Sequence, residues 1–226
     1  MRAAQQRPMG SETLSQHWDD VYSCRAADQV SWYQQQPQPS LEWIQRLASE
    51  RSSRILDVGG GTSLLVDALL DCGYSDLTVL DLSAAALATS RQRLAERAEA
   101  VRWIVADILA DALPLPAFDL WHDRAVFHFL VEPADRQRYV SQLQRSLRPG
   151  GLLILATFAE DGPEHCSGLP VQRHSVDTLR QALADGLELL DQQRVSHHTP
   201  GGVEQKFLYT AWQAKPRSDL TAQTSG

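Results

Sequence analysis

The sequence predicts an α/β fold: a doubly wound sheet of seven strands, mostly parallel, with an antiparallel hairpin strand near the C-terminus. Short β-rich runs alternate with helical segments from residue 53 to residue 158, and this alternation is typical of repeated β-α-β crossovers. Two extended runs, LELLDQQRV and EQKFLYTAWQ, then follow with a polar loop between them. Such a pair predicts a hairpin that joins the sheet in the antiparallel direction.

The first five strands are predicted at SRILDV, LTVLD, VRWIVADI, FDLWHD and LLILATF. Helices are predicted at residues 63–72, 83–97, 133–147 and 176–184. Several helix ends carry their own sequence signals. Ser83 suits an N-cap, Pro133 suits a first helical turn, and Gly73 suits the position after a helix.

The chain is predicted to form one domain over residues 11–214. Residues 1–10 and 215–226 are polar and aperiodic, and we expect them to be disordered tails. Residues 11–50 are helical and rich in aromatic residues, with HWDDVY, VSWY and LEWI. Because they precede the first core strand, we expect them to cover the domain as a lid or a flank.

Composition narrows the functional classes. The formal net charge is −7 and there is no basic run, which disfavours nucleic acid as a partner. No stretch approaches the ~18 apolar residues that cross a membrane, and the N-terminus lacks the apolar core of a secretory signal. Cys24, Cys72 and Cys166 lie far apart, so we expect free thiols, a cytoplasmic location and no structural zinc.

A glycine loop follows the first strand in ILDVGGGTSL, where Gly59, Gly60 and Gly61 stand between a strand and a helix. Glycines at that place allow a tight turn and a close approach of the backbone to a ligand. The dinucleotide fingerprint GxGxxG is incomplete, because Leu64 stands at its third glycine. Asp57 in the preceding strand suggests instead a D-x-G-x-G turn in which the carboxylate is part of the site.

Carboxylates also end the next two strands. Asp81 stands about 20 residues beyond the loop, where a carboxylate can accept hydrogen bonds from both ribose hydroxyls. Asp107 ends the third strand, where it can accept the adenine amino proton while Ile108 packs on the base. Three carboxylates at one sheet edge would repel a pyrophosphate and suit a cationic ligand.

The ordered motifs ILDVGGGTS, VLDLS, VADI, FDLWHDRA and LRPGGLLIL resemble those of the class I S-adenosylmethionine-dependent methyltransferases, over about residues 54–160. The resemblance implies a Rossmann-like fold and S-adenosylmethionine as cofactor. It places Asp57 and the glycines beside the methionine part, Asp81 at the ribose, and Asp107 with Ile108 at the adenine. The cofactor-binding residues that it implies are Trp18, Tyr22, Trp32, Asp57, Gly59, Gly60, Gly61, Asp81, Leu82, Asp107 and Ile108.

The segment HWDDVYSCRAADQVSWYQQQP is similar to the N-terminal segment of the thiopurine, thiol and halide methyltransferases, in which aromatic residues close over the cofactor. FDLWHDRA and the following Pro133, Asp135, Arg136 and Tyr139 are also similar to that branch. The resemblance implies methyl transfer to a small soft nucleophile, a thiol or a hydrosulfide. Related lid segments occur in protein-lysine methyltransferases, so that class stays open, together with other O- or N-methylation of small molecules and a non-catalytic binding module.

The fourth strand ends in three ionisable residues, His122, Asp123 and Arg124. Asp123 and Arg124 are the predicted catalytic pair. Arg124 can hold a thiolate or a substrate oxygen, and Asp123 can accept the thiol proton or pair with Arg124. His122 and His128 are alternative bases, although His128 is better explained as a core residue.

The loop at residues 161–174 follows the fifth strand and is expected to shape the acceptor pocket. A nucleophilic role for Cys166 is disfavoured, because methyl transfer needs no covalent enzyme intermediate. The HHTPGG segment is better explained as a hairpin loop than as a metal site, and we predict no metal. The expected partner is a small-molecule acceptor, and the expected state is a monomer or a homodimer.

Overall fold

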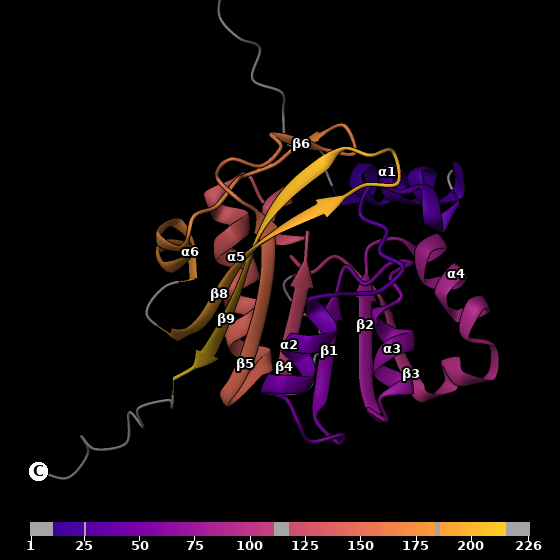
Figure 1. The fold of residues 1–226 in the computed structure, drawn as a ribbon, viewed down its shortest axis with the longest axis horizontal. Helices are drawn as coiled ribbons and strands as arrows, with labels where there is room; N and C mark the ends of the chain where they lie inside the picture. The colour runs from indigo at the N-terminus through magenta and orange to yellow at the C-terminus, as the bar shows by residue number, and fades with distance from the viewer. Residues whose placement is uncertain (1–10, 25, 111–117, 184–185, 216–226) are drawn as a thin grey trace, which may run out of the picture.

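A computed structural model describes residues 11–24, 26–110, 118–183 and 186–215. The predicted tail at 1–10 and nearly all of the tail at 215–226 lie outside the described residues. The described chain forms a seven-stranded sheet in the order β3-β2-β1-β4-β5-β9-β8 (Figure 1). The pairs from β3 to β5 are parallel, whereas β9 pairs antiparallel with both β5 and β8. The predicted Rossmann-like sheet with an antiparallel hairpin is confirmed.

The strands of the large sheet are β1 Arg54–Val58, β2 Asp76–Asp81, β3 Val101–Val105, β4 Phe118–Arg124, β5 Leu147–Phe158, β8 Leu187–His198 and β9 Glu204–Ala214. A separate small hairpin consists of β6 His165–Cys166 and β7 Leu169–Pro170. The α-helices are α1 Ser11–Cys24, α2 Ser40–Leu47, α3 Leu65–Asp71, α4 Ala84–Leu94, α5 Pro133–Ser146 and α6 Val176–Leu183. Three 3₁₀ turns are η1 Ala27–Gln29, η2 Ala95–Ala100 and η3 Phe127–Phe129.

Local sequence signals explain several element boundaries. The Ser83 hydroxyl accepts a hydrogen bond from the backbone N–H of Ala86 at 3.1 Å, so Ser83 is the N-cap of α4 as predicted. Pro133 opens α5, also as predicted. The α3 helix begins at Leu65, two residues after the predicted start, because the Ser63 hydroxyl accepts from the Leu65 N–H at 3.1 Å and occupies the turn before the helix.

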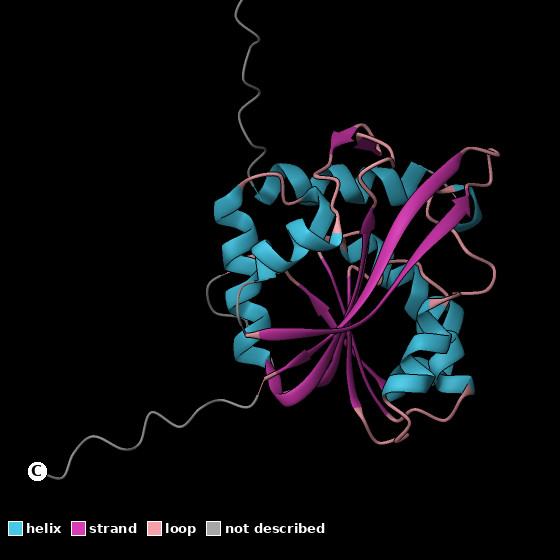
Figure 2. Ribbon diagram, turned by 60° about the vertical axis from the view of Figure 1, so that its left-hand side comes forward, coloured by secondary structure: helices cyan, strands magenta, loops and turns pink. Residues whose placement is uncertain are grey.

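Helices cover both faces of the sheet, as Figure 2 shows, and each face has its own apolar core. Side chains alternate between the faces along a strand. In β4, Leu120 therefore belongs to the core that contains Ile44 of α2, whereas Trp121 belongs to the core that contains Leu143 of α5. The same alternation sends the next two side chains, His122 and Asp123, to opposite faces.

The N-terminal region lies over the carboxyl edge of the sheet, where α1 sits beside the start of α4 (Figure 1). The Asp19 carboxylate accepts hydrogen bonds from the Ser83 hydroxyl at 2.5 Å and from the Ala85 N–H at 3.2 Å. An acidic group at a helix N-terminus is favourable because the first N–H groups have no partner inside the helix. This contact fixes α1 at one edge of the sheet. Within the described ranges, no helix has the length and apolar character needed to span a bilayer.

Candidate functional site

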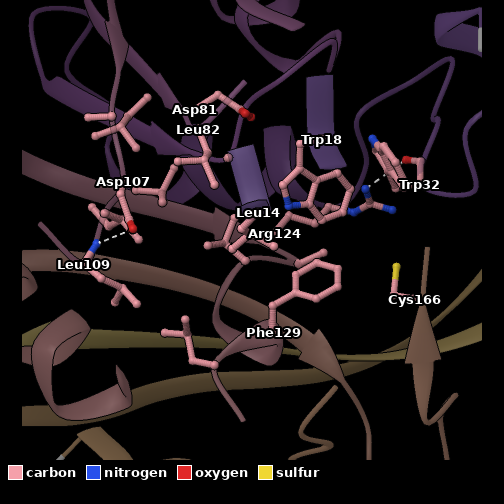
Figure 3. Close-up of a pocket in the computed structure, with 18 of the residues that line it drawn as sticks. Leu14, Trp18, Trp32, Asp81, Leu82, Asp107, Leu109, Arg124, Phe129 and Cys166 are labelled. Atoms are coloured by element: carbon pink, nitrogen blue, oxygen red, sulfur yellow. Dashed lines mark hydrogen bonds between the residues drawn. The ribbon is translucent and has the colours of Figure 1, made fainter. Parts of the chain in front are cut away.

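A pocket opens at the carboxyl edge of the sheet, beneath α1 (Figure 3). Open α/β sheets bind ligands at this edge, where loops leave the parallel strands. The lining is mainly apolar, with Asp81, Asp107, Arg124 and Gln205 among its polar side chains. A mostly apolar cavity with a few convergent polar groups is the usual form of a small-molecule site.

The glycine loop reaches the pocket through Gly59, just after β1. Gly59 and Gly61 have φ angles of 67° and 47°, which favour glycine over residues with side chains. Added Cβ atoms would also collide with neighbours: that of Gly59 would overlap the Val126 side chain, and that of Gly61 would lie 2.5 Å from the Tyr22 hydroxyl. The Gly59 N–H donates to the Leu80 carbonyl at 2.7 Å, which joins the loop to β2.

Asp81 ends β2 and lines the pocket with only 6% of its surface exposed. Its carboxylate accepts a hydrogen bond from the Ser83 N–H at 2.8 Å. Burial nevertheless raises the pKa of Asp81 to about 7, because desolvation outweighs the backbone hydrogen bonds from Ser83 and Gly61. A ligand with hydroxyl donors would stabilise the ionised form, so the position is suited to a ribose diol.

The segment after β3 provides a narrow apolar wall. Ile108 is buried, and Leu82 and Leu109 line the same pocket. The Asp107 carboxylate accepts the Leu109 N–H at 2.9 Å, a contact drawn in Figure 3. Apolar side chains around one carboxylate suit a flat base with an exocyclic amine, which is the chemistry of adenine.

Four rings form the aromatic lid, which we define as Trp18, Tyr22, Trp32 and Phe129. All four line the pocket (three of them are labelled in Figure 3). Ring centroids of Trp18 lie 5.7 Å from Trp32 and 5.2 Å from Phe129, and Tyr22 lies 5.7 Å from Trp32, all in edge-to-face geometry. Such pairs are favourable beyond their buried area. They connect α1 to the segments around Trp32 and η3.

Arg124, at the end of β4, lies between Trp32 and Cys166 in the far wall of the pocket (Figure 3). Its Nη1 donates to the Trp32 carbonyl oxygen at 3.0 Å, and its guanidinium carbon lies 5.0 Å from the centre of the Phe207 ring. Nε and Nη2 are buried and have no hydrogen-bond partner within the described part of the chain. Burial raises the pKa of the Cys166 thiol to about 11, so this thiol stays protonated at neutral pH and forms a wall.

Asp123 is not brought together with Arg124. Its carboxylate is fully buried and accepts hydrogen bonds from the Tyr139 hydroxyl at 2.5 Å and from the N–H groups of Val126 at 2.9 Å and Phe127 at 3.2 Å. Burial raises the pKa of Asp123 to about 6. The described ion pairs do not join it to Arg124, and it is absent from the residues that line the pocket. Of the two roles that the sequence left open for Asp123, pairing with Arg124 is not found among the described ion pairs, and the geometry favours a structural role for Asp123.

A buried polar chain runs through the opposite face of β4. The Asp57 carboxylate lies 2.7 Å from His122 Nδ1, His122 Nε2 lies 2.8 Å from the Ser40 hydroxyl, and that hydroxyl lies 3.3 Å from the Tyr209 hydroxyl. We call Asp57, His122, Ser40 and Tyr209 the buried polar chain. This chain of contacts was not predicted from the sequence. The available signal was strand register, because Asp57 and His122 are direct partners between β1 and β4.

His128 lies in the apolar interior. It is fully buried, and its Nδ1 accepts the Phe158 N–H at 3.3 Å. Burial lowers the pKa of His128 to about 3, which keeps the ring neutral. The explanation of His128 as a core residue therefore agrees with the geometry. In the described ranges, no three His, Cys, Asp or Glu side chains form a cluster able to hold a metal ion.

The pocket brings together most of the predicted cofactor residues: Trp18, Tyr22, Trp32, Gly59, Asp81, Leu82, Asp107 and Ile108. Asp57, Gly60 and Gly61 are not part of its lining, and Asp57 binds His122 instead. Leu14, Phe129, Phe158, Gln205 and Phe207 also line the pocket and were not predicted. The carboxylate of Asp81, the apolar wall and the tight glycine turn together fit an adenosine ligand.

Comparison with known proteins shows what this chain is similar to. Residues 55–151 match the model of a family described as a methyltransferase domain. A malonyl-[acyl-carrier protein] O-methyltransferase of Paenibacillus sp. (strain JDR-2) is 33% identical over 154 residues, which make up 58% of this chain and 54% of that protein. EEF1A lysine methyltransferase 2 of Danio rerio is 29% identical over 123 residues, 52% of this chain and 53% of that protein. The chain thus spans about half the length of these curated relatives.

Solved structures share the fold over almost the whole chain. A structure titled for the conversion of a disulfide bond into a thioacetal group during echinomycin biosynthesis has a TM-score of 0.74 and 20% identity, covering 91% of this chain and 93% of that one. The 1,6-didemethyltoxoflavin-N1-methyltransferase of Burkholderia thailandensis, solved with S-adenosylhomocysteine, has a TM-score of 0.66 and 21% identity, covering 95% and 98%. The chain therefore shares the fold of these proteins, and its residues 55–151 are similar to a methyltransferase domain.

Proposed function

We propose that this protein transfers the methyl group of S-adenosylmethionine to a small acceptor that reacts as an anion, with a thiol or hydrosulfide as the favoured acceptor. The observation that carries the proposal is the wall around Arg124. Its cation lies over the Phe207 ring, and apart from Asp81 and Asp107, which we assign to the nucleoside, the described lining of the pocket offers no carboxylate or imidazole as a base. A site of this kind favours an acceptor that brings its own negative charge.

The cofactor supplies a methyl group on a positively charged sulfur. The acceptor's lone pair would take this methyl group as the carbon–sulfur bond of the bound cofactor breaks, and the electron pair of that bond would stay on the departing sulfur. The protein's task in this displacement is alignment and the exclusion of water. The aromatic lid supports that role, because three of its rings come from the N-terminal segment above the sheet edge.

A thiol suits these surroundings because an unperturbed thiol has a pKa of about 8.5 and its thiolate is the reactive form. The positive charge of Arg124 favours the thiolate of a bound acceptor and opposes the effect of burial, which dominates at Cys166. We assign Asp81 to the ribose, Asp107 and Ile108 to the adenine, and the glycine loop to the methionine part of the cofactor.

Two relatives suggest other acceptors. The name of the Danio rerio relative specifies lysine, but a lysine ammonium would meet the positive charge of Arg124 at the acceptor wall, which disfavours that class. The name of the Paenibacillus relative specifies O-methylation of a malonyl group. An anionic carboxylate is compatible with Arg124, so O-methylation of a carboxylic acid is the second candidate.

The test is an acceptor panel with purified protein and S-adenosylmethionine. The panel contains hydrosulfide, aliphatic and aromatic thiols, a malonyl thioester and a lysine-containing protein extract with radiolabelled cofactor. We expect methyl thioethers and stoichiometric S-adenosylhomocysteine from at least one thiol. Methyl esters without thioethers would replace the first candidate by the second. Labelled protein bands alone would overturn both, and tight cofactor binding without any product would indicate a binding module.

A further inference from the structure

One edge of the Arg124 guanidinium has no hydrogen-bond partner in the described residues, and methyl transfer itself does not require such an edge. Of its three nitrogens, Nη1 donates to the Trp32 carbonyl at 3.0 Å, while Nε and Nη2 are buried without a partner in the described ranges. In a planar guanidinium, the N–H bonds of Nε and Nη2 point in parallel from the same edge. That edge matches the two oxygens of a carboxylate, which binds it through two hydrogen bonds.

Burying this edge of the guanidinium without a hydrogen-bond acceptor has a free-energy cost. Charged donors removed from water lose their hydration, and they need a hydrogen-bond acceptor in its place. The other contacts of the side chain keep it in position, because Nη1 is held at Trp32 and the guanidinium lies over the Phe207 ring. The edge is thus fixed in the wall of the pocket, and a carboxylate reaches it when the side chains that cover Nε and Nη2 move aside.

We propose that Arg124 binds a carboxylate carried by the acceptor, and that this carboxylate anchors the acceptor while another of its atoms is methylated. The proposal rests on the proposed function and narrows it to acceptors with a carboxylate near the nucleophile. A single sulfur atom engages one donor well, whereas a carboxylate engages both. A carboxylate held at both oxygens is also a poor nucleophile, since its lone pairs and its charge are already used.

The first test measures binding and needs no turnover. The protein is loaded with S-adenosylhomocysteine and titrated by calorimetry with 3-phenylpropionate and with its neutral match, 3-phenylpropan-1-ol. We expect the acid to bind about 10- to 100-fold more tightly than the alcohol, the range of a charged hydrogen-bond pair. Equal affinities for the two compounds in the unaltered protein would overturn the proposal.

Variants of Arg124 test whether this residue causes the preference for the acid. Arg124→Gln should remove the preference for the acid, and Arg124→Lys should keep part of it, because it retains the charge but not the paired donors. Arg180→Gln is the matched control, since Arg180 pairs with Asp177 on the exposed surface of α6. Circular dichroism checks that each variant is folded. A full preference for the acid in folded Arg124→Gln would contradict the proposal.

The cofactor's own carboxylate is the other source of the same chemistry. Affinities for S-adenosylhomocysteine and for 5′-methylthioadenosine, which lacks the amino acid part, separate the two sources. If Arg124 serves the acceptor, Arg124→Gln leaves the ratio of these affinities unchanged. A selective loss of S-adenosylhomocysteine affinity of tenfold or more would assign the edge to the cofactor and overturn the proposal.

Turnover then separates this inference from the proposed function. We expect 3-mercaptopropionate to have a KM at least tenfold below that of 3-mercaptopropan-1-ol, with thioether products from both. Equal KM values would leave thiol methylation standing and refute the anchor. No turnover of any thiol, with the binding preference intact, would refute thiol methylation and leave a carboxylate site. A methyl ester as the main product would overturn the anchor, because the carboxylate itself would then be the nucleophile.

Discussion

Asp123 and Arg124 are neighbours at the end of β4, yet their side chains have entirely separate partners. Asp123 accepts the Tyr139 hydroxyl at 2.5 Å, whereas Arg124 donates to the Trp32 carbonyl at 3.0 Å. Strand alternation explains the separation, because consecutive side chains leave a strand on opposite faces. The acidic member therefore supports the turn at η3, and the basic member reaches the pocket.

Replacing Asp123 tests its structural role. Asp123→Ala should cost about 2–4 kcal/mol of unfolding free energy, because it leaves two buried N–H groups and the Tyr139 hydroxyl without their acceptor. Asp123→Asn keeps a carbonyl acceptor and should retain methyl transfer within a few-fold of the unaltered protein. Urea unfolding and steady-state rates measure the two effects. A loss of activity of a thousandfold in folded Asp123→Asn would restore the catalytic role.

The same carboxyl predicts a pH dependence of stability. Its pKa is about 6 in the folded protein, above the value of about 3.9 in an unfolded chain, so the folded state holds the proton more tightly. This stabilising contribution is complete below about pH 4 and is lost as the pH rises through 6. Between about pH 4 and pH 7, the unaltered protein should lose roughly 2 kcal/mol relative to Asp123→Asn. A constant difference between the two proteins over that range would contradict the assignment.

Asp81 should link cofactor binding to pH. Its pKa is about 7 without ligand, and ribose hydroxyls that donate to the carboxylate would lower it. Affinity for S-adenosylhomocysteine should therefore fall as the pH drops below 7, and binding near pH 7 should release a proton. Calorimetry in buffers with different ionisation enthalpies measures that proton. Asp81→Asn is the control: it should bind more weakly and without this pH dependence.

Trp18 should control how firmly the aromatic lid closes. Its ring contacts Trp32 and Phe129 edge to face, so Trp18→Ala removes two aromatic pairs together with a large apolar surface. We expect the dissociation constant of S-adenosylhomocysteine to rise about tenfold or more. Trp103→Phe, on β3 outside the pocket lining, is a suitable control. An unchanged dissociation constant in Trp18→Ala would remove the lid from cofactor binding.

In the buried polar chain, His122 contacts Asp57 just before the glycine loop. We therefore expect the stability of the protein to depend on His122. His122→Ala leaves the buried Asp57 carboxylate without its hydrogen-bond partner, and leaving such a group unsatisfied costs about 1–3 kcal/mol. Thermal unfolding should show the loss. Ser40→Ala is a milder change at the other end of the chain and should cost about 1 kcal/mol. Equal stability of His122→Ala and the unaltered protein would contradict this account.

The fold and half of the pocket could be predicted because they follow from local patterns. Asp81 ends β2 and Asp107 follows β3 by two residues, and parallel strands bring such ends to one edge. The roles of Asp123 and Asp57 could not be predicted in the same way. They depend on the face of the sheet to which each side chain points and on the residue that packs against that face. Asp123 meets Tyr139 of α5, and Asp57 meets His122, which in turn contacts Ser40 of α2.

Phe207 and Gln205 illustrate a further limit. They line the pocket from β9, which is the last of these strands in the sequence. In the sheet, β9 lies between β5 and β8. Their alternation within EQKFLYTAWQ shows that they share a face, but it does not show that this face meets Arg124. Only the register between β5 and β9 decides that, and it is a long-range property.

The attachment of α1 has a consequence for the exchange of the nucleoside and the acceptor. One helix is joined to Leu82 and Ser83 at the nucleoside end and, through Trp18 and Trp32, to the carbonyl that holds Arg124 at the other end. A movement of this helix would therefore disturb the contacts at both ends of the pocket at once. We expect exchange of the nucleoside and exchange of the acceptor to depend on that same movement.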